Sequence, residues 1–150
     1  MAFQLAELNI ARFKQAIDDP INKGFVDNLA SVNAQAESAT GFVWRLVGDG
    51  DDAMDIQAFD DPNTVINLSV WENKEALVAF VYGNEDHKNI MKRRREWFAR
   101  IQFNVVLWWL PKGYTPTIGE AKQRLALLEK HGPSPYAFSF AQNIAPPTHA

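Results

Sequence analysis

The sequence predicts an α+β protein in which an antiparallel sheet carries helices on one face. The prediction has three grounds. Some segments alternate apolar and polar residues with period two, whereas others repeat apolar residues at helical spacing. The segments follow the order strand, helix, strand, strand, helix, strand, and a further helix comes after them. The chain has 150 residues, 47% of them hydrophobic, which suits one domain with a substantial core.

The first strand is expected at residues 3–11, FQLAELNIA. Period two sets Glu7 and Asn9 on the side opposite the residues Gln4, Ala6, Leu8 and Ile10. A polar loop around Pro20 ends this strand. Apolar residues at helical spacing then predict a helix from about residue 22 to residue 38, and Gly41 follows its end.

Two more strands are expected, at residues 41–47 and 64–72. In the second, TVINLSVWE, one face is apolar with Ile66, Leu68 and Val70. The other face is mixed, with Val65, Asn67, Ser69 and Trp71. A mixed face favours a pocket, a partner surface or water. Between the strands, GDGDDAMDIQAFDDP lacks the sixth-position glycine and the final glutamate of a calcium loop. We expect a solvated connection there, with room for a short strand at 55–59.

The rest of the chain predicts two helical regions around one more strand. The first runs over residues 74–100 and breaks near Gly83-Asn84. The strand NVVLWWL, 104–110, stops at Pro111, and a helix from about 116 to 131 stops at Gly132. We expect one domain over residues 1–140 and a flexible, proline-rich tail over 141–150.

This order is the split βαβ pattern of ferredoxin-like domains, whose sheet has helices on one face. The other face would be left uncovered. Because the predicted strands carry apolar and aromatic residues on both sides, a second subunit is expected to cover that face. The sequence therefore predicts a homodimer.

Composition excludes several classes of function. The chain has no cysteine, which rules out disulfides and thiolate metal sites. Its net charge of −3 favours neither nucleic acid nor an anionic membrane, and the run Lys92 to Arg95 points its four side chains in different directions around a helix. The chain shows no secretory signal, no apolar stretch near the ~20 residues of a membrane span, and no P-loop or nucleophile elbow. We expect a cytoplasmic protein.

The stretch NEDHKNIMKRRREWF, 84–98, sets a histidine and an arginine in the apolar stripe of a helix. Arg94 lies about 20° from His87 around the helix axis, close to Trp97 and Phe98. A buried Arg94 would need a carboxylate, a carbonyl or an anionic ligand group, or its charge would reach solvent. His87 is a core or boundary residue, a proton-transfer group, or an axial haem ligand. A single imidazole is too few for structural zinc.

Several segments closely resemble the bacterial family catalogued as domain of unknown function 3291. They are GFVWRL, NLSVWE, RRREWF and LWWLPKGYTPT. The resemblance implies the dimeric α+β barrel superfamily, which includes antibiotic-biosynthesis-type and haem-degrading monooxygenases. Asn9 is similar to an asparagine of the haem degraders, and His87 to their haem ligand. Phe80 stands near the position of their catalytic tryptophan.

The main hypothesis is a monooxygenase-like enzyme that holds a small apolar or aromatic ligand between the sheet and the helices. In it, His87 and Asn9 are the catalytic candidates, and Arg94 or Arg45 would fix an anionic group. The other lining residues would be Asn67, Ser69, Trp71 and Phe80. The resemblance implies that no cofactor is required, although haem on His87 is an alternative. The rival hypothesis is a non-enzymatic homodimer that binds a ligand or serves as a structural module.

Overall fold

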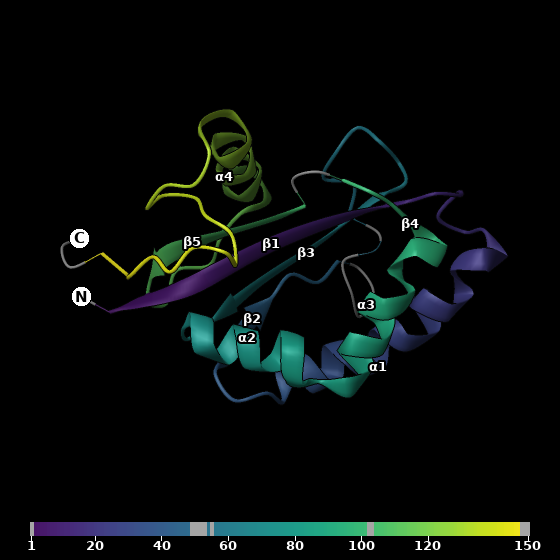
Figure 1. Ribbon diagram of the computed structural model, residues 1–150, viewed down its shortest axis with the longest axis horizontal. Helices are drawn as coiled ribbons and strands as arrows, with labels where there is room; N and C mark the ends of the chain where they lie inside the picture. Colours follow the sequence, from purple (N-terminus) through teal and green to yellow (C-terminus); the bar gives the residue numbers. More distant parts are fainter. Residues whose placement is uncertain (1, 49–53, 55, 102–103, 148–150) are drawn as a thin grey trace.

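An antiparallel sheet forms the centre of the computed structural model, which describes residues 2–48, 54, 56–101 and 104–147 (Figure 1). Its strands are β1 (Phe3–Phe13), β2 (Phe42–Arg45), β3 (Thr64–Trp71), β4 (Phe98–Ala99) and β5 (Val105–Pro111). The helices are the 3-10 turn η1 (Pro20–Asn22), α1 (Lys23–Glu37), α2 (Lys74–Gly83), α3 (Glu85–Trp97) and α4 (Ile118–His131).

The strand order confirms the predicted ferredoxin-like pattern. β1 lies between β3 on one side and β4 and β5 on the other, and β2 pairs with the outer side of β3. The short strand β4 was not expected, because helical spacing appeared to continue to residue 100. The helix ends at Trp97, which is buried, and Phe98 and Ala99 instead pair with the end of β1.

The two faces of the sheet carry separate cores, as the alternation predicts. Leu8, Leu68 and Trp108 are among the residues that pack under α4, whereas Leu5, Trp71 and Leu107 face the other side. Figure 1 shows α4 over one face and α1, α2 and α3 over the opposite face. The face that we expected a second subunit to cover is therefore buried by this chain's own C-terminal helix.

The segment after α4 runs along the free edge of β5. Leu107 and Phe138 exchange both backbone hydrogen bonds, at 2.7 and 3.0 Å. The indole nitrogen of Trp109 donates to the carbonyl of Ile144 at 3.0 Å, and Lys74 Nζ donates to the carbonyl of Gln142 at 2.7 Å. These contacts attach residues 142–144 to the domain that we expected to end at residue 140.

Local chemistry sets the helix boundaries near the sheet. Asn73 and Asn84 cap α2 and α3 with their side-chain oxygens, and Asn84 lies at the predicted break. Gly41 has φ +85°, and a Cβ there would clash with the Cβ of Ala76, so only glycine fits. Residues 56–59 form no strand, whereas 49–53 and 55 of the same connection lie outside the described residues.

Candidate functional site

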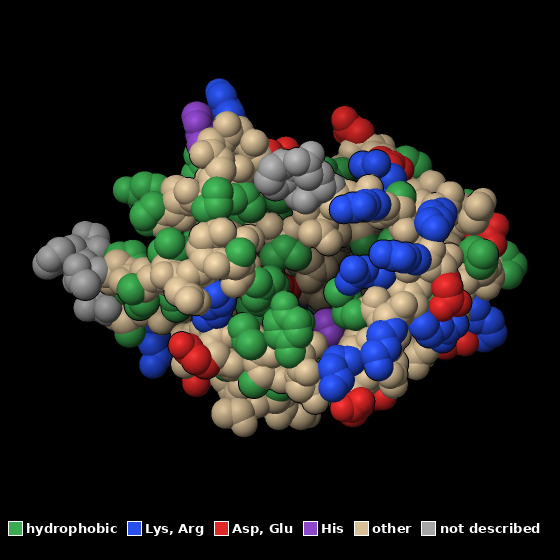
Figure 2. Space-filling view, viewed as in Figure 1, with side chains coloured by type: hydrophobic (Ala, Val, Ile, Leu, Met, Phe, Trp, Pro, Cys, Tyr) green, Lys and Arg blue, Asp and Glu red, His purple; other side chains and the backbone are tan. Residues whose placement is uncertain are grey.

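Four polar residues lie in two adjacent rows on the sheet face that α1, α2 and α3 cover. Glu7 pairs with Ser69 across β1 and β3, and Asn9 pairs with Asn67. Ser69 is buried, yet Asn67, in the middle of the same strand, is exposed. Solvent therefore reaches the sheet at Asn67. Figure 2 shows a hollow in the molecule, edged by hydrophobic side chains, by a histidine and by lysine and arginine side chains.

A continuous series of ring contacts leads from the sheet to α3. The indole nitrogen of Trp71 donates to Ser69 Oγ at 3.0 Å. Trp71 stacks on Phe80 with ring centroids 5.5 Å apart, and Phe80 meets His87 edge to face at 5.6 Å. Trp71 is 2% exposed, whereas Phe80 and His87 are partly exposed. The rings of Phe80 and His87 therefore form a wall of the hollow, and Trp71 packs behind Phe80.

Among the residues that the structure describes, Glu7 is the one acidic residue that is buried, with 5% of its surface exposed. Asn9 Nδ2 donates to Glu7 Oε1 at 2.9 Å. Oε2 accepts no hydrogen bond from a described residue and is not among the fully buried unpartnered atoms, so it borders accessible space. Burial raises the pKa of Glu7 to about 7, and the hydrogen bond from Asn9 opposes this only in part.

Glu7 was not among the catalytic residues predicted from the sequence. One feature of the sequence could have indicated Glu7: it lies between Leu5 and Asn9 on one face of the first strand. The mixed face of the neighbouring strand lies on the same side of the sheet. A carboxyl among apolar residues of a central strand must either find a cation or shift its pKa. Within the described residues Glu7 has an amide as its partner and no cation.

His87 is held in place by the first turn of α3. Asn84 Oδ1 accepts from the backbone N–H of His87 at 2.8 Å, and the amide of Asn84 donates to Gln35 on α1. Within the described residues, His87 Nδ1 is buried without a hydrogen-bond partner. Burial lowers the pKa of His87, and a hydrogen bond with the backbone of Val81 acts in the opposite direction. The imidazole is therefore neutral near pH 7.

These contacts do not fit an axial haem ligand. Such a histidine must present a ring nitrogen to space that holds a porphyrin. Here Nδ1 is covered by protein and the ring meets Phe80 at its edge. Across the part of the chain that the structure describes, no three His, Asp or Glu side chains are grouped to hold a metal ion.

The two candidate arginines differ from expectation. Arg94 does not enter the core but is exposed. α3 packs on α1 and α2, and these contacts bury Trp97 but leave the Arg94 side chain exposed. Arg45 lies opposite Ser69 on the site face, but its guanidinium pairs with Glu37 at 2.9 Å.

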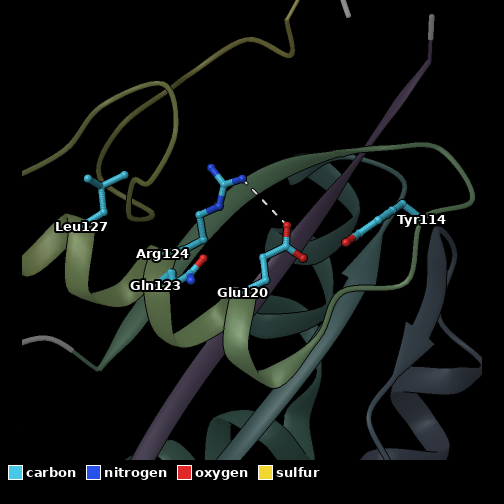
Figure 3. Close-up of a pocket in the computed structure, with 5 residues that line it drawn as sticks. All are labelled: Tyr114, Glu120, Gln123, Arg124 and Leu127. Atoms are coloured by element: carbon cyan, nitrogen blue, oxygen red, sulfur yellow. Dashed lines mark ion pairs between the residues drawn. The ribbon is translucent and has the colours of Figure 1, made fainter.

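A second pocket lies on the other side of the sheet, along α4 (Figure 3). It is open, has a volume of about 490 Å³ and is lined by Tyr114, Glu120, Gln123, Arg124 and Leu127. Arg124 pairs loosely with Glu120 at 3.8 Å. This pocket contains none of the predicted site residues. We take the hollow over Asn67 as the candidate functional site.

The fold defines a ferredoxin-like α+β protein, and the candidate site lies between its sheet and the three helices on one face. The family model of the domain of unknown function DUF3291 matches residues 4–150, and the chain belongs to that family. No match was found among curated proteins. No helix in the described ranges is long and apolar enough to cross a bilayer.

Several solved structures share the fold at low sequence identity. PA3566 from Pseudomonas aeruginosa is 11% identical, with 76% of this chain and 98% of that chain covered and a TM-score of 0.50. A conserved protein from Methanosarcina mazei is 12% identical, with 73% and 93% covered and a TM-score of 0.50. SnoaB from Streptomyces nogalater, described as a cofactor-independent oxygenase, is 15% identical, with 76% and 97% covered and a TM-score of 0.48. At these identities the similarity shows the fold alone.

Proposed function

We propose that this protein is a monooxygenase-like acid–base enzyme that binds a small, largely aromatic ligand in the hollow over Asn67. Glu7 is the proton acceptor. Asn9 and Asn67 orient the ligand from the sheet, and Phe80 and His87 form the wall against which its ring lies. The proposal uses no resident cofactor.

The single observation that carries the proposal is the environment of Glu7. The side chain is 5% exposed, has a neutral amide as its hydrogen-bond partner and leaves Oε2 bordering accessible space. A carboxyl in this environment changes protonation state near neutral pH, which suits a general base. It can take a proton directly or through one water molecule, because the part-exposed Asn9 adjoins it.

The reaction class follows from what a buried base does to an aromatic ligand. Removing a proton from an acidic methylene leaves a carbanion whose charge spreads into the rings. That carbanion is electron-rich and reacts with O₂, the oxidant. Overall, CH₂ and O₂ give C=O and H₂O, so the methylene carbon is oxidised and O₂ is reduced. Glu7 takes the first methylene proton, the carbanion carbon forms a bond to O₂, and Glu7 returns the proton to give a hydroperoxide. Loss of the second hydrogen from that carbon as a proton forms C=O and breaks the O–O bond, and the departing hydroxide takes up this proton to leave as water.

His87 has a supporting part in this proposal. Its imidazole is neutral near pH 7, because burial lowers its pKa. It therefore presents an uncharged ring beside Phe80, against which an aromatic ligand can pack. The other predicted lining residues, Ser69 and Trp71, hydrogen-bond to each other, so we propose that they hold the shape of the wall.

Oxygen uptake with dithranol tests the proposal. This anthrone has an acidic methylene between two aromatic rings. We expect Glu7→Gln to lower the enzyme-dependent rate at least about 100-fold, the usual size of a lost general base. The rate of the wild-type protein should rise with pH as Glu7 ionises, whereas the exposed Glu129→Gln variant should match the wild type.

Two results would contradict the proposal. Equal rates in Glu7→Gln and wild type would exclude Glu7 as the base. A wild-type rate no faster than spontaneous oxidation, with dithranol and with unsubstituted anthrone, would favour a non-enzymatic binding or structural module instead.

Homodimerisation and a cytoplasmic location stay predictions. The original reason for a dimer was an uncovered sheet face, and α4 covers that face here. A dimer must therefore use a different surface of the chain. Light scattering after size-exclusion chromatography would decide between a mass of 16.9 kDa and twice that value.

A further inference from the structure

The helix α3 carries a stripe that leads from the wall of the hollow to the surface. His87, Met91 and Arg94 follow one another at spacings of four and three residues, so they lie on one side of the helix. His87 is partly buried, Met91 is 41% exposed, and Arg94 is exposed. The stripe therefore passes from the ring contact with Phe80 out to a cation.

Among the described residues, no acidic side chain pairs with the guanidinium of Arg94. The Arg94 side chain also makes no hydrogen bond within the part of the chain that the structure describes. Its neighbours differ, because Arg93 pairs with Glu96 at 2.9 Å and Lys88 pairs with Glu85 at 3.0 Å. Figure 2 shows lysine and arginine side chains beside the hollow, although the whole chain has a net charge of −3.

The interior of the hollow has a different chemistry from its rim. Asn9 and Asn67 pair across β1 and β3 with neutral amides, and the rings of Phe80 and His87 contact each other on the helix side. A flat ring suits these groups, whereas an anionic group does not suit the neighbourhood of the buried Glu7. Arg94 is exposed and lies further along α3 than His87, so it suits an anion that stays at the surface.

We propose that the hollow binds a flat aromatic molecule with one anionic group, its ring against Phe80 and His87 and its anion on Arg94. This inference rests on the proposed function, because it takes the same hollow as the ligand site. It adds the class of the ligand and makes Arg94 a specificity-determining residue. A carboxylate or a sulfonate would make the paired hydrogen bonds that a guanidinium offers.

Two dyes with the same rings test the inference. 1-Anilinonaphthalene-8-sulfonate carries one anionic group, and N-phenyl-1-naphthylamine is its neutral counterpart. Fluorescence titrations would give the Kd of each dye for wild type, Arg94→Gln and Lys92→Gln. Lys92 is an exposed cation on the same helix, about 200° around the axis from Arg94, so it controls for loss of surface charge.

We expect Arg94→Gln to weaken binding of the anionic dye about three- to tenfold and to leave the neutral dye unchanged. Lys92→Gln should change both by less than about twofold, because an unpaired surface charge acts weakly through salt solution. Asn67→Trp fills the hollow from an exposed position and should abolish binding of both dyes. Circular dichroism would verify that each variant is folded.

Three results would overturn the inference. They are an unchanged Kd for the anionic dye in Arg94→Gln, an equal loss in Lys92→Gln, and undiminished binding of both dyes to folded Asn67→Trp. The proposed function fails separately. If Glu7→Gln and wild type oxidise dithranol equally but the dyes behave as expected, the anion site at Arg94 is supported and the role of Glu7 as the base is refuted.

Discussion

Replacing Glu7 by glutamine tests the buried carboxyl directly, because the change keeps the shape of the side chain and removes its proton. The pKa of Glu7 rises from 4.5 to about 7 on folding, a difference of about 2.5 (7 − 4.5). One pKa unit corresponds to about 1.4 kcal/mol, so the full effect on the free energy of unfolding is about 3 kcal/mol.

The sign follows from which state holds the proton. Between pH 4.5 and pH 7 the folded protein keeps the proton on Glu7, whereas the unfolded chain has lost it. Stability from this group is therefore complete below about pH 4.5 and is lost as the pH rises through 7. The glutamine of Glu7→Gln does not titrate, so the variant does not lose this stability as the pH rises. Its free energy of unfolding relative to wild type should increase by about 2 to 3 kcal/mol between pH 5 and pH 8.

Urea unfolding followed by tryptophan fluorescence at pH 5 and pH 8 would measure the difference. Comparing the variant with wild type at each pH cancels the titration of every other group. Glu129→Gln removes a carboxylate from the exposed side of α4 and serves as the control, with the same offset expected at both pH values. If the free energy of unfolding of Glu7→Gln differs from that of wild type by the same amount at pH 5 and pH 8, burial does not raise the pKa of Glu7. The reason for choosing Glu7 as the base is then also wrong.

Three further predictions address the framework of the site. Asn84→Ala removes the cap of α3 and should cost about 1 kcal/mol in urea unfolding, while Asn28→Ala on the exposed side of α1 should cost less. Trp108→Ala should cost about 3 to 5 kcal/mol, because the ring is fully buried under α4, and a cost below about 1 kcal/mol would mean that α4 does not cover this face. Haemin titration should give no saturable Soret shift that His87→Ala removes. Such a shift, near one haem per chain, would reinstate His87 as an axial ligand.

Periodicity in the sequence was sufficient to predict which strand residues lie on each face of the sheet. The alternation in 64–72 separated Ile66, Leu68 and Val70 from Asn67 and Ser69. The structure has the first set in the core under α4, whereas Ser69 and the exposed Asn67 lie on the opposite face. The break at Gly83-Asn84 was also predictable, because an asparagine after a glycine both ends one helix and caps the next. These features depend on neighbours in the chain, which the sequence contains.

The burial of side chains along α3 was not predictable in the same way. Helical spacing set Arg94 on the side of His87, and this is correct, but the angle around a helix does not tell how far the neighbouring layer extends. His87 meets Phe80 from α2, and Trp97 is buried three residues after Arg94, yet the Arg94 side chain between them is exposed.

The sequence by itself determined the order of the main elements apart from β4, the two faces of each long strand, the break at Gly83-Asn84 and the family. Only the tertiary structure decided that α4 covers the second face, that Asn67 is exposed in the middle of β3, and that Glu7 has an amide for a partner. The physical reason is that alternation and capping are local, whereas desolvation depends on which distant segments pack over a residue. The pKa of Glu7, and the chemistry proposed for it, follow from that packing.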